Sequence, residues 1–159
     1  MIQVVFFFFQ ILRGARGAGP SLDMGHMILV FGKTGQVATE LQRQGDVTAL
    51  GRDQADLSDP QGCAAVIADL KPSVVINAAA YTAVDRAEEE RDTAMIVNAM
   101  APTAIAAACA AKGIPFVQIS TDYVFDGEKK EGYLPEDKPN PINVYGKTKL
   151  EGERVIQQR

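Results

Sequence analysis

The sequence contains no tryptophan, one histidine and two cysteines among 159 residues. With His26 as the single histidine, a Ser-His-Asp triad or a histidine-rich metal site is nearly excluded. Cys63 and Cys109 lie far apart without metal-ligand spacing, and both have alanine-rich, apolar neighbours. We therefore expect two buried, reduced thiols and no cysteine-based metal site.

The chain also lacks an excess of positive charge and a long apolar run. Its net charge of −4 argues against nucleic acid or an anionic membrane as a partner. The apolar run at residues 2–12 is shorter than the roughly 20 residues that span a bilayer. Its basic residues follow the run, whereas a secretory signal carries them in front. We expect residues 1–26 to be a non-native or disordered extension before a start at Met24 or Met27; the alternative is a membrane-associating leader.

Residues 27–159 are enough for one domain with a real core. Short apolar runs rich in β-branched residues alternate with helical patterns along this part of the chain. The pattern predicts strands at 27–31, 47–50, 73–77 and 114–119, helices at 36–44, 58–70, 93–112 and from 143 onward, and a surface loop at 126–140. Such alternation predicts an α/β fold, a Rossmann-like doubly wound parallel sheet.

A glycine-containing turn follows the first expected strand and opens the first expected helix. It reads GKTGQVA, with Gly32 and Gly35 at its two glycine positions. Small residues here let the backbone approach a pyrophosphate, which then sits on the helix N-terminus. The context favours a dinucleotide site, although this spacing alone also suits a structural turn.

Two further segments fit a dinucleotide. Arg52 follows the second expected strand, where a guanidinium can meet a 2′-phosphate, so NADPH is favoured over NADH. Asp53 could instead serve a ribose, and an exposed arginine is often only solvated. After the third strand, the small residues Ala78, Ala79 and Ala80 would let a cofactor lie against the backbone, or they simply pack tightly.

Tyr145 and Lys149 are four residues apart, so on a helix their side chains share one face. A neighbouring ammonium favours the phenolate and lowers the pKa of a tyrosine, which would suit a general acid. Thr121, after the fourth strand, could hydrogen-bond a carbonyl oxygen that Tyr145 protonates. The plainer alternatives are a solvated helix face and a strand-to-loop capping cluster at residues 120–122. Asn98, within the long helix, could hold water and backbone near the lysine or face solvent.

Four segments in one order carry a family resemblance: GKTGQV from Gly32, VINAAAYTAVD from Val75, STDYVF from Ser120 and NVYGKTKLEGE from Asn143. Together they resemble the dTDP-4-dehydrorhamnose reductases, a family of extended short-chain dehydrogenases/reductases. The resemblance implies reduction of the 4-keto group of dTDP-4-dehydrorhamnose by NADPH or NADH. It also implies a cytoplasmic protein, a possible homodimer and a possible Mg²⁺ whose ligands cannot be assigned.

The resemblance also assigns roles to residues. Tyr145 would be the proton donor, Lys149 would lower its pKa and hold the nicotinamide ribose, and Thr121 would orient the keto oxygen. Asp122 would neighbour the sugar. Gly35, Gln36 and Val37 would meet the pyrophosphate. Asp56 and Leu57 would flank the adenine, and Ala78 to Ala80 would line the cofactor groove.

Three departures from the family pattern stand out. Ala38 replaces a third glycine, a small change, and Gly51 stands where some relatives have the ribose-binding acid, which weakens NADH as sole cofactor. Relatives of this kind are close to twice as long, so we expect the fold to lack the C-terminal substrate domain and the fourth strand to be an exposed edge. Two alternatives stay open: a silent, cofactor-binding regulatory subunit like that of methionine adenosyltransferase, and another nucleotide-sugar epimerase or dehydratase.

Overall fold

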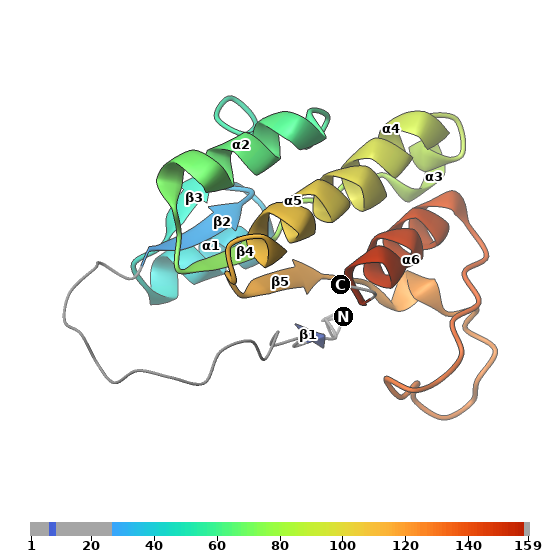
Figure 1. Ribbon diagram of the computed structural model, residues 1–159. Helices are drawn as coiled ribbons and strands as arrows, with labels where there is room; N and C mark the ends of the chain where they lie inside the picture. The colour runs from blue at the N-terminus through green and yellow to red at the C-terminus, as the bar shows by residue number, and fades with distance from the viewer. Residues whose placement is uncertain (1–6, 9–26, 158–159) are drawn as a thin grey trace.

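The computed structural model describes residues 7–8 and 27–157 (Figure 1). Its centre is a sheet in the order β1-β5-β4-β2-β3. Four strands are parallel: β2 (Ile28–Phe31), β3 (Thr48–Leu50), β4 (Val74–Asn77) and β5 (Phe116–Ile119). The chain leaves β2 on one side to form β3 and crosses to the other side for β4. This reversal is the switch point at which open α/β sheets bind ligands.

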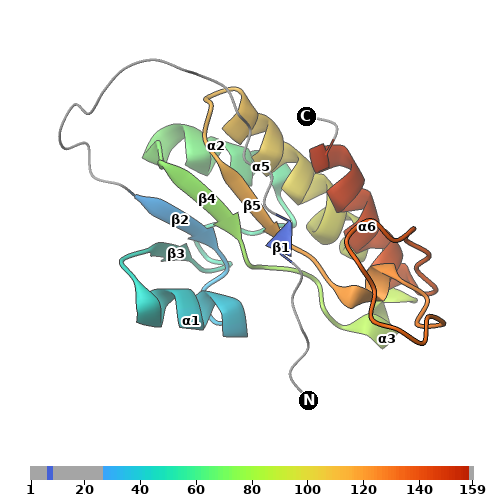
Figure 2. The same cartoon turned by 90° about the horizontal axis from the view of Figure 1, so that it is seen from below.

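The helices form layers beside the sheet. Helix α2 (Pro60–Leu70) packs on α5 (Ala101–Ala110), and α6 (Val144–Gln157) lies beside α5. Helix α1 (Gln36–Gln44) lies next to β3, apart from α2 and α5 (Figure 2). The structure thus confirms the predicted Rossmann-like α/β fold, and all four predicted strands begin one or two residues later than predicted. Asp59 caps α2, since its carboxylate accepts a hydrogen bond from the Gly62 N–H at 3.0 Å.

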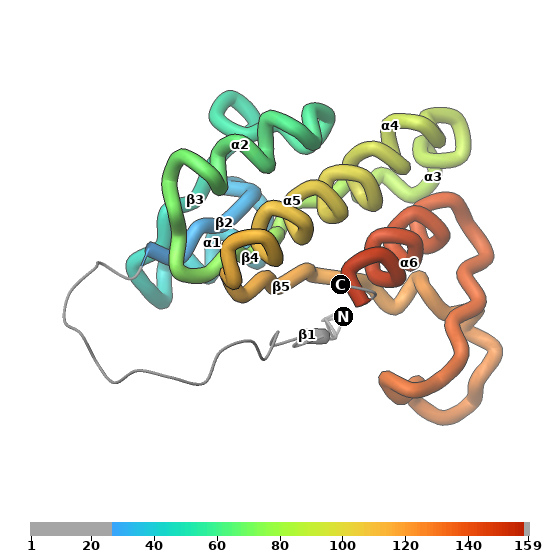
Figure 3. Tube along the Cα trace, in the orientation of Figure 1, coloured from blue at the N-terminus to red at the C-terminus, as the bar shows by residue number. Residues whose placement is uncertain are grey.

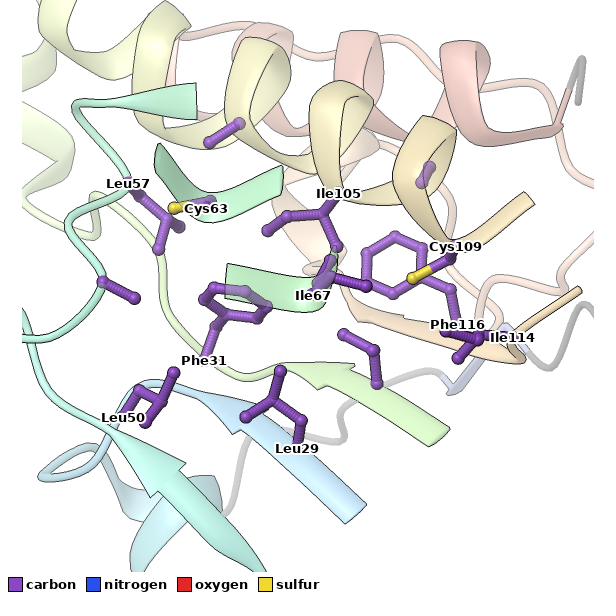
Figure 4. Packing of buried hydrophobic residues seen from close by; sticks show 14 of the residues in the cluster. Leu29, Phe31, Leu50, Leu57, Cys63, Ile67, Ile105, Cys109, Ile114 and Phe116 are labelled. Carbon is purple, nitrogen blue, oxygen red and sulfur yellow. The ribbon is translucent and has the colours of Figure 1, made fainter. Parts of the chain in front are cut away.

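The core lies between the sheet and the layer formed by α2 and α5. Leu29, Phe31 and Phe116 from the strands meet Ile67 and Ile105 from the helices (Figure 4). Each of these side chains contributes about 1.5–3 kcal/mol through burial.

Both cysteines lie in this core and are unpaired, as predicted. Burial raises the pKa of the Cys63 thiol to about 11 and that of Cys109 to about 12. The thiols therefore stay protonated and unreactive at neutral pH.

The predicted helix at 93–112 is a composite of three pieces. Helix α4 (Arg91–Met95) passes into a π-helical segment, η1 (Ile96–Met100), before α5 begins. By length and composition the stretch Arg91–Ala110 could cross a membrane, but half of its most apolar window is buried, as in a core helix of a soluble protein. Alanine-rich patterning predicts helix without distinguishing α from π geometry, so η1 could not be anticipated.

Helix α6 is held at its start by two side chains. The Asn143 side chain accepts from the Gly146 N–H at 2.7 Å, and Glu88 accepts from the Val144 N–H at 2.8 Å. Glu88 directly follows the short helix α3 (Val84–Ala87), so a distant segment sets where α6 begins.

A long loop between the short 3₁₀ helix η2 (Asp122–Val124) and α6 projects from the body of the molecule (Figure 3). Asp126 organises it by accepting hydrogen bonds from the Tyr133 hydroxyl at 2.5 Å and the Asn140 amide at 2.9 Å. These bonds lower the pKa of Asp126 to about 2. The predicted surface loop is therefore present and internally ordered.

Strand β1 (Phe7–Phe8) pairs antiparallel with β5, with Phe7 opposite Ile119 and Phe8 opposite Gln118. The sequence predicts that β5 is an exposed edge strand, but two residues of β5, Gln118 and Ile119, pair with β1. The rest of the expected extension, residues 1–6 and 9–26, lies outside the described residues.

Candidate cofactor and catalytic site

A cavity of about 770 Å³ lies at the carboxyl ends of the parallel strands. Every residue that the sequence suggests for cofactor binding lines it, although the positions come from four separate segments of the chain. These residues are Gly32, Gly35, Gln36, Val37, Arg52, Asp56, Leu57, Ala78, Ala79, Ala80, Tyr145 and Lys149. The structure brings these residues together, while their roles stay predictions.

The turn after β2 forms one wall of the cavity. Gly32 has φ = +99°, a conformation that side chains rarely adopt, and a Cβ there would lie 3.2 Å from the Ala79 Cβ. The Gly32 N–H donates to the Leu50 oxygen at 3.0 Å, which ties the turn to the end of β3. Small residues at 32 and 79 thus let two strand ends approach closely.

Helix α1 begins at this wall with Gly35 at its N-cap and no side chain bonded to its first amides. The free N–H groups and the positive end of the helix dipole suit a phosphate group. This backbone geometry fits the pyrophosphate of a dinucleotide.

Charged side chains from the segment after β3 line one end of the cavity. Arg52 has an 85% exposed side chain, and its Nε lies 3.9 Å from Asp56 Oδ1. The Asp56 carboxylate accepts from the Ser58 N–H at 2.9 Å, and hydrogen bonds to Ser58 lower its pKa. Arg52 is weakly engaged and therefore free to bind an anion, while Asp53 also lines this end.

Tyr145 and Lys149 of α6 form the other end of the cavity, away from Arg52. Both emerge from the same face of α6, and the side chains are buried, with Lys149 only 3% exposed. The Lys149 Nζ donates to the Ile119 oxygen at 2.6 Å. Burial lowers the pKa of Lys149 to about 8, and the Glu153 carboxylate opposes this change.

The pKa of Tyr145 differs from the sequence-based prediction. It is raised, because burial disfavours the phenolate; a hydrogen bond with the Thr121 side chain opposes the shift, and the charges of Asp122 and Tyr123 add to it. The Lys149 ammonium points to the backbone at Ile119. The predicted lowering by Lys149 is therefore wrong for this conformation.

Thr121 and Asp122 lie at the border of the site. Both are absent from the cavity lining, although Thr121 contacts Tyr145. The Thr121 hydroxyl donates to Asp122 Oδ1 at 3.2 Å and accepts from the Tyr123 N–H at 3.3 Å. The Tyr123 ring meets the Tyr145 ring edge-on, with centroids 5.4 Å apart. These contacts orient the phenol from the side of η2.

The buried Asn98 side chain connects the elements that form the Tyr145 end of the cavity. It is 1% exposed, and its amide accepts from the Tyr81 N–H at 2.9 Å and donates to the Tyr81 oxygen at 3.0 Å. It also donates to Thr148 Oγ1 at 3.1 Å. Asn98 therefore joins η1 to the segment after β4 and to α6, and the solvent-facing alternative is wrong.

Sequence reasoning missed Glu153, one turn after Lys149. Ser120 donates a hydrogen bond to its carboxylate, and burial raises the pKa of Glu153. The spacing of Tyr145, Lys149 and Glu153 along one helix face was the available signal.

The described part of the chain contains no group of three or more His, Cys, Asp or Glu residues placed to hold a metal ion. Residues 7–8 and 27–157 therefore offer no such cluster for the Mg²⁺ that the resemblance implies.

The parallel sheet, the glycine turn at its switch point and the buried tyrosine–lysine pair define a Rossmann-like α/β domain with a cavity at the carboxyl edge of its sheet. Comparison with protein families matches residues 26–159 to the RmlD substrate binding domain. The chain belongs to this family.

Curated relatives and solved structures agree with that membership. A dTDP-4-dehydrorhamnose reductase of Burkholderia thailandensis is 48% identical over 135 residues, which cover 82% of this chain and 45% of the relative. The reductase of Salmonella typhimurium is 46% identical over 138 residues, 82% of this chain and 46% of the relative.

The crystal structure of the Bacillus anthracis reductase, in complex with NADP, superposes with a TM-score of 0.80 at 35% identity, covering 87% of this chain and 51% of that one. The chain spans about half the length of these relatives.

Proposed function

We propose that this chain is the cofactor-binding half of an NADPH-dependent reductase acting on the 4-keto group of dTDP-4-dehydrorhamnose. The observation that carries the proposal is the burial of Tyr145 and Lys149 at one end of a cavity whose other wall is the Gly32 turn. The names of the relatives supply the substrate.

The cofactor would lie along the cavity. The amides at the start of α1 would bind the pyrophosphate, with Gly35, Gln36 and Val37 closest. Arg52 would pair with a 2′-phosphate, and Lys149 would hold the nicotinamide ribose. Asp56 and Leu57 would flank the adenine, and Ala78 to Ala80 would line the groove.

Bound NADPH supplies the hydride, and the protein supplies the proton. Because the pKa of Tyr145 is raised above its usual value, the phenol is protonated at neutral pH, as a proton donor must be. Thr121 would hydrogen-bond the same keto oxygen and orient it toward the phenol. Asp122, beside Thr121, would neighbour the sugar.

The two alternatives make different demands on these residues. A regulatory subunit has no need of Thr121, Tyr145 and Lys149 together, which favours the enzyme. An epimerase shares the fold: the structure of the UDP-Glc/GlcNAc 4-epimerase of Campylobacter jejuni has a TM-score of 0.71 at 23% identity, a likeness that concerns fold alone. Cytoplasmic location, a homodimer and Mg²⁺ dependence stay predictions.

The cofactor preference can be tested with Arg52→Ala in the 159-residue chain. We expect the dissociation constant for NADPH to rise about tenfold, or about 1.4 kcal/mol, because a charge-assisted contact to the 2′-phosphate is lost. Binding of NADH should be unchanged. Isothermal titration calorimetry measures both constants.

The matched control is Arg43→Ala, which removes an exposed arginine on α1 paired with Glu40 outside the cavity. Equal NADPH affinity in the Arg52 variant and the control would contradict the proposed preference. We also expect little turnover of the keto sugar by this polypeptide, since the relatives carry as much chain again; turnover at the rate of a full-length relative would refute that.

A further inference from the structure

Helix α6 contacts the exit of β5 with three side chains placed one turn apart. Tyr145 hydrogen-bonds Thr121, the Lys149 Nζ bonds the Ile119 oxygen at 2.6 Å, and the Glu153 carboxylate accepts from Ser120. Three consecutive residues of the strand exit are therefore each held by one residue of the helix row. The proposed reaction uses Tyr145, Lys149 and Thr121 and leaves Glu153 without a role.

Glu153 is a half-buried carboxylate, and burial of this kind costs free energy unless partners compensate. The Ser120 hydroxyl donates to it, and the positive charges of Lys149 and Arg154 favour its ionised form. Arg154 is 59% exposed and also lies 3.8 Å from Glu151. Of these two positive charges Lys149 is the buried one, and it lies one turn before Glu153 on the same helix.

The buried Lys149 ammonium in turn requires a group that compensates its positive charge. The ammonium donates a hydrogen bond to a neutral carbonyl, that of Ile119. Within the described chain, Glu153 is the titratable group whose charge acts on the Lys149 pKa. The nearby charges of Asp122 and Tyr123 act on Tyr145 instead.

We propose that Glu153 is a positioning residue of this site: tethered by Ser120, it supplies the counter-charge that keeps the buried Lys149 ammonium protonated. The inference deepens the proposed function, since a cationic Lys149 is the form that would hold the nicotinamide ribose. The Ser120 hydrogen bond favours the charged form of the carboxylate and so opposes burial, which raises the pKa of Glu153.

The test measures the titration of Lys149 directly. In protein labelled with ¹³C-lysine, the ¹³Cε shift of Lys149 is followed against pH and assigned by its loss in Lys149→Met. Wild-type protein should titrate with a pKa of about 8. Glu153→Gln keeps an oxygen for Ser120 but removes the charge, so the midpoint should move to lower pH.

Two variants separate charge from structure. Glu151→Gln removes the same charge from an exposed position of α6 and should leave the midpoint unchanged. Glu153→Asp retains the charge and should stay closer to wild type than Glu153→Gln. A midpoint in Glu153→Gln equal to that in Glu151→Gln overturns the proposal.

If Glu153→Gln does not fold by circular dichroism, Ser120→Ala carries the test. Loss of the tether should let Glu153 take up a proton more readily and move the Lys149 midpoint down by a smaller amount; an unchanged midpoint overturns the proposal. NADPH binding at pH 7.5 is the second readout and should weaken in Glu153→Gln. Absence of NADPH binding in the wild type would refute the proposed function alone, because the lysine titration judges Glu153 independently.

Discussion

The two ends of the cavity are built differently. The phosphate end, so named for the group that we propose it binds, is a short continuous stretch, residues 32–37, with backbone amides at the start of α1 and a left-handed glycine. The Tyr145 end joins η1, the exit of β5 and α6, which are far apart in sequence, through buried polar contacts. Local sequence suffices for the first end, whereas the second exists only when the elements pack.

The largest expected effect is on the packed end, through Gly146→Ala. A Cβ at Gly146 would lie 2.1 Å from the Tyr123 oxygen and 2.9 Å from its carbonyl carbon, so backbone must move. We expect α6 to shift away from η2 and the free energy of unfolding to fall by about 3 kcal/mol. Urea denaturation measures the change.

Gly132→Ala is the control, because a Cβ there meets nothing within 4 Å and its φ is not positive. It should change stability by no more than about 0.5 kcal/mol. Equal stability of the two variants would show that the contact between α6 and η2 is not tight.

A smaller effect is expected from Asn98→Ala. The variant leaves the Tyr81 N–H and carbonyl without their buried partner, which should cost about 2 kcal/mol. Asn140→Ala removes an amide that bonds Asp126 at an exposed site and should cost about 0.5 kcal/mol or less. Thermal unfolding of both variants provides the comparison, and a similar loss in each would argue against Asn98 as a link between elements.

The smallest effect on stability is expected at the phosphate end. Gly32→Ala forces a side chain into the left-handed region and should cost about 1 kcal/mol. Its Cβ would also press on Ala79, so NADPH affinity should fall by more than stability does. In Gly35→Ala the nearest atom to the new Cβ is the Ala78 oxygen at 3.9 Å, an ordinary contact, so folding should be unaffected. Unaltered NADPH binding by Gly32→Ala would show that the turn does not form the phosphate site.

Much of the fold could be predicted because its signals are local. Apolar runs that end at Gly32 and Asn77 mark buried strands, and the Asp59 cap marks the start of α2. The π-helical segment could not be predicted, since residues 96–100 are compatible with an α-helix. The pairing of β1 with β5 was missed as well, because strand partners depend on tertiary contacts that a short apolar run does not specify.

The candidate site likewise has features that the sequence predicts and features that depend on tertiary contacts. The spacing of Tyr145 and Lys149 by itself placed the two side chains on one face of a helix, because the helical period fixes which side chains share a face. The strand–turn–helix context of Gly32 placed the glycine turn at the end of a strand. Only the tertiary structure decided the electrostatics: burial raised the pKa of Tyr145 and lowered that of Lys149, and the Lys149 ammonium bonded the Ile119 carbonyl. The physical reason is that a pKa depends on solvent exclusion and on charges brought in from other segments, and neither exists until the elements pack.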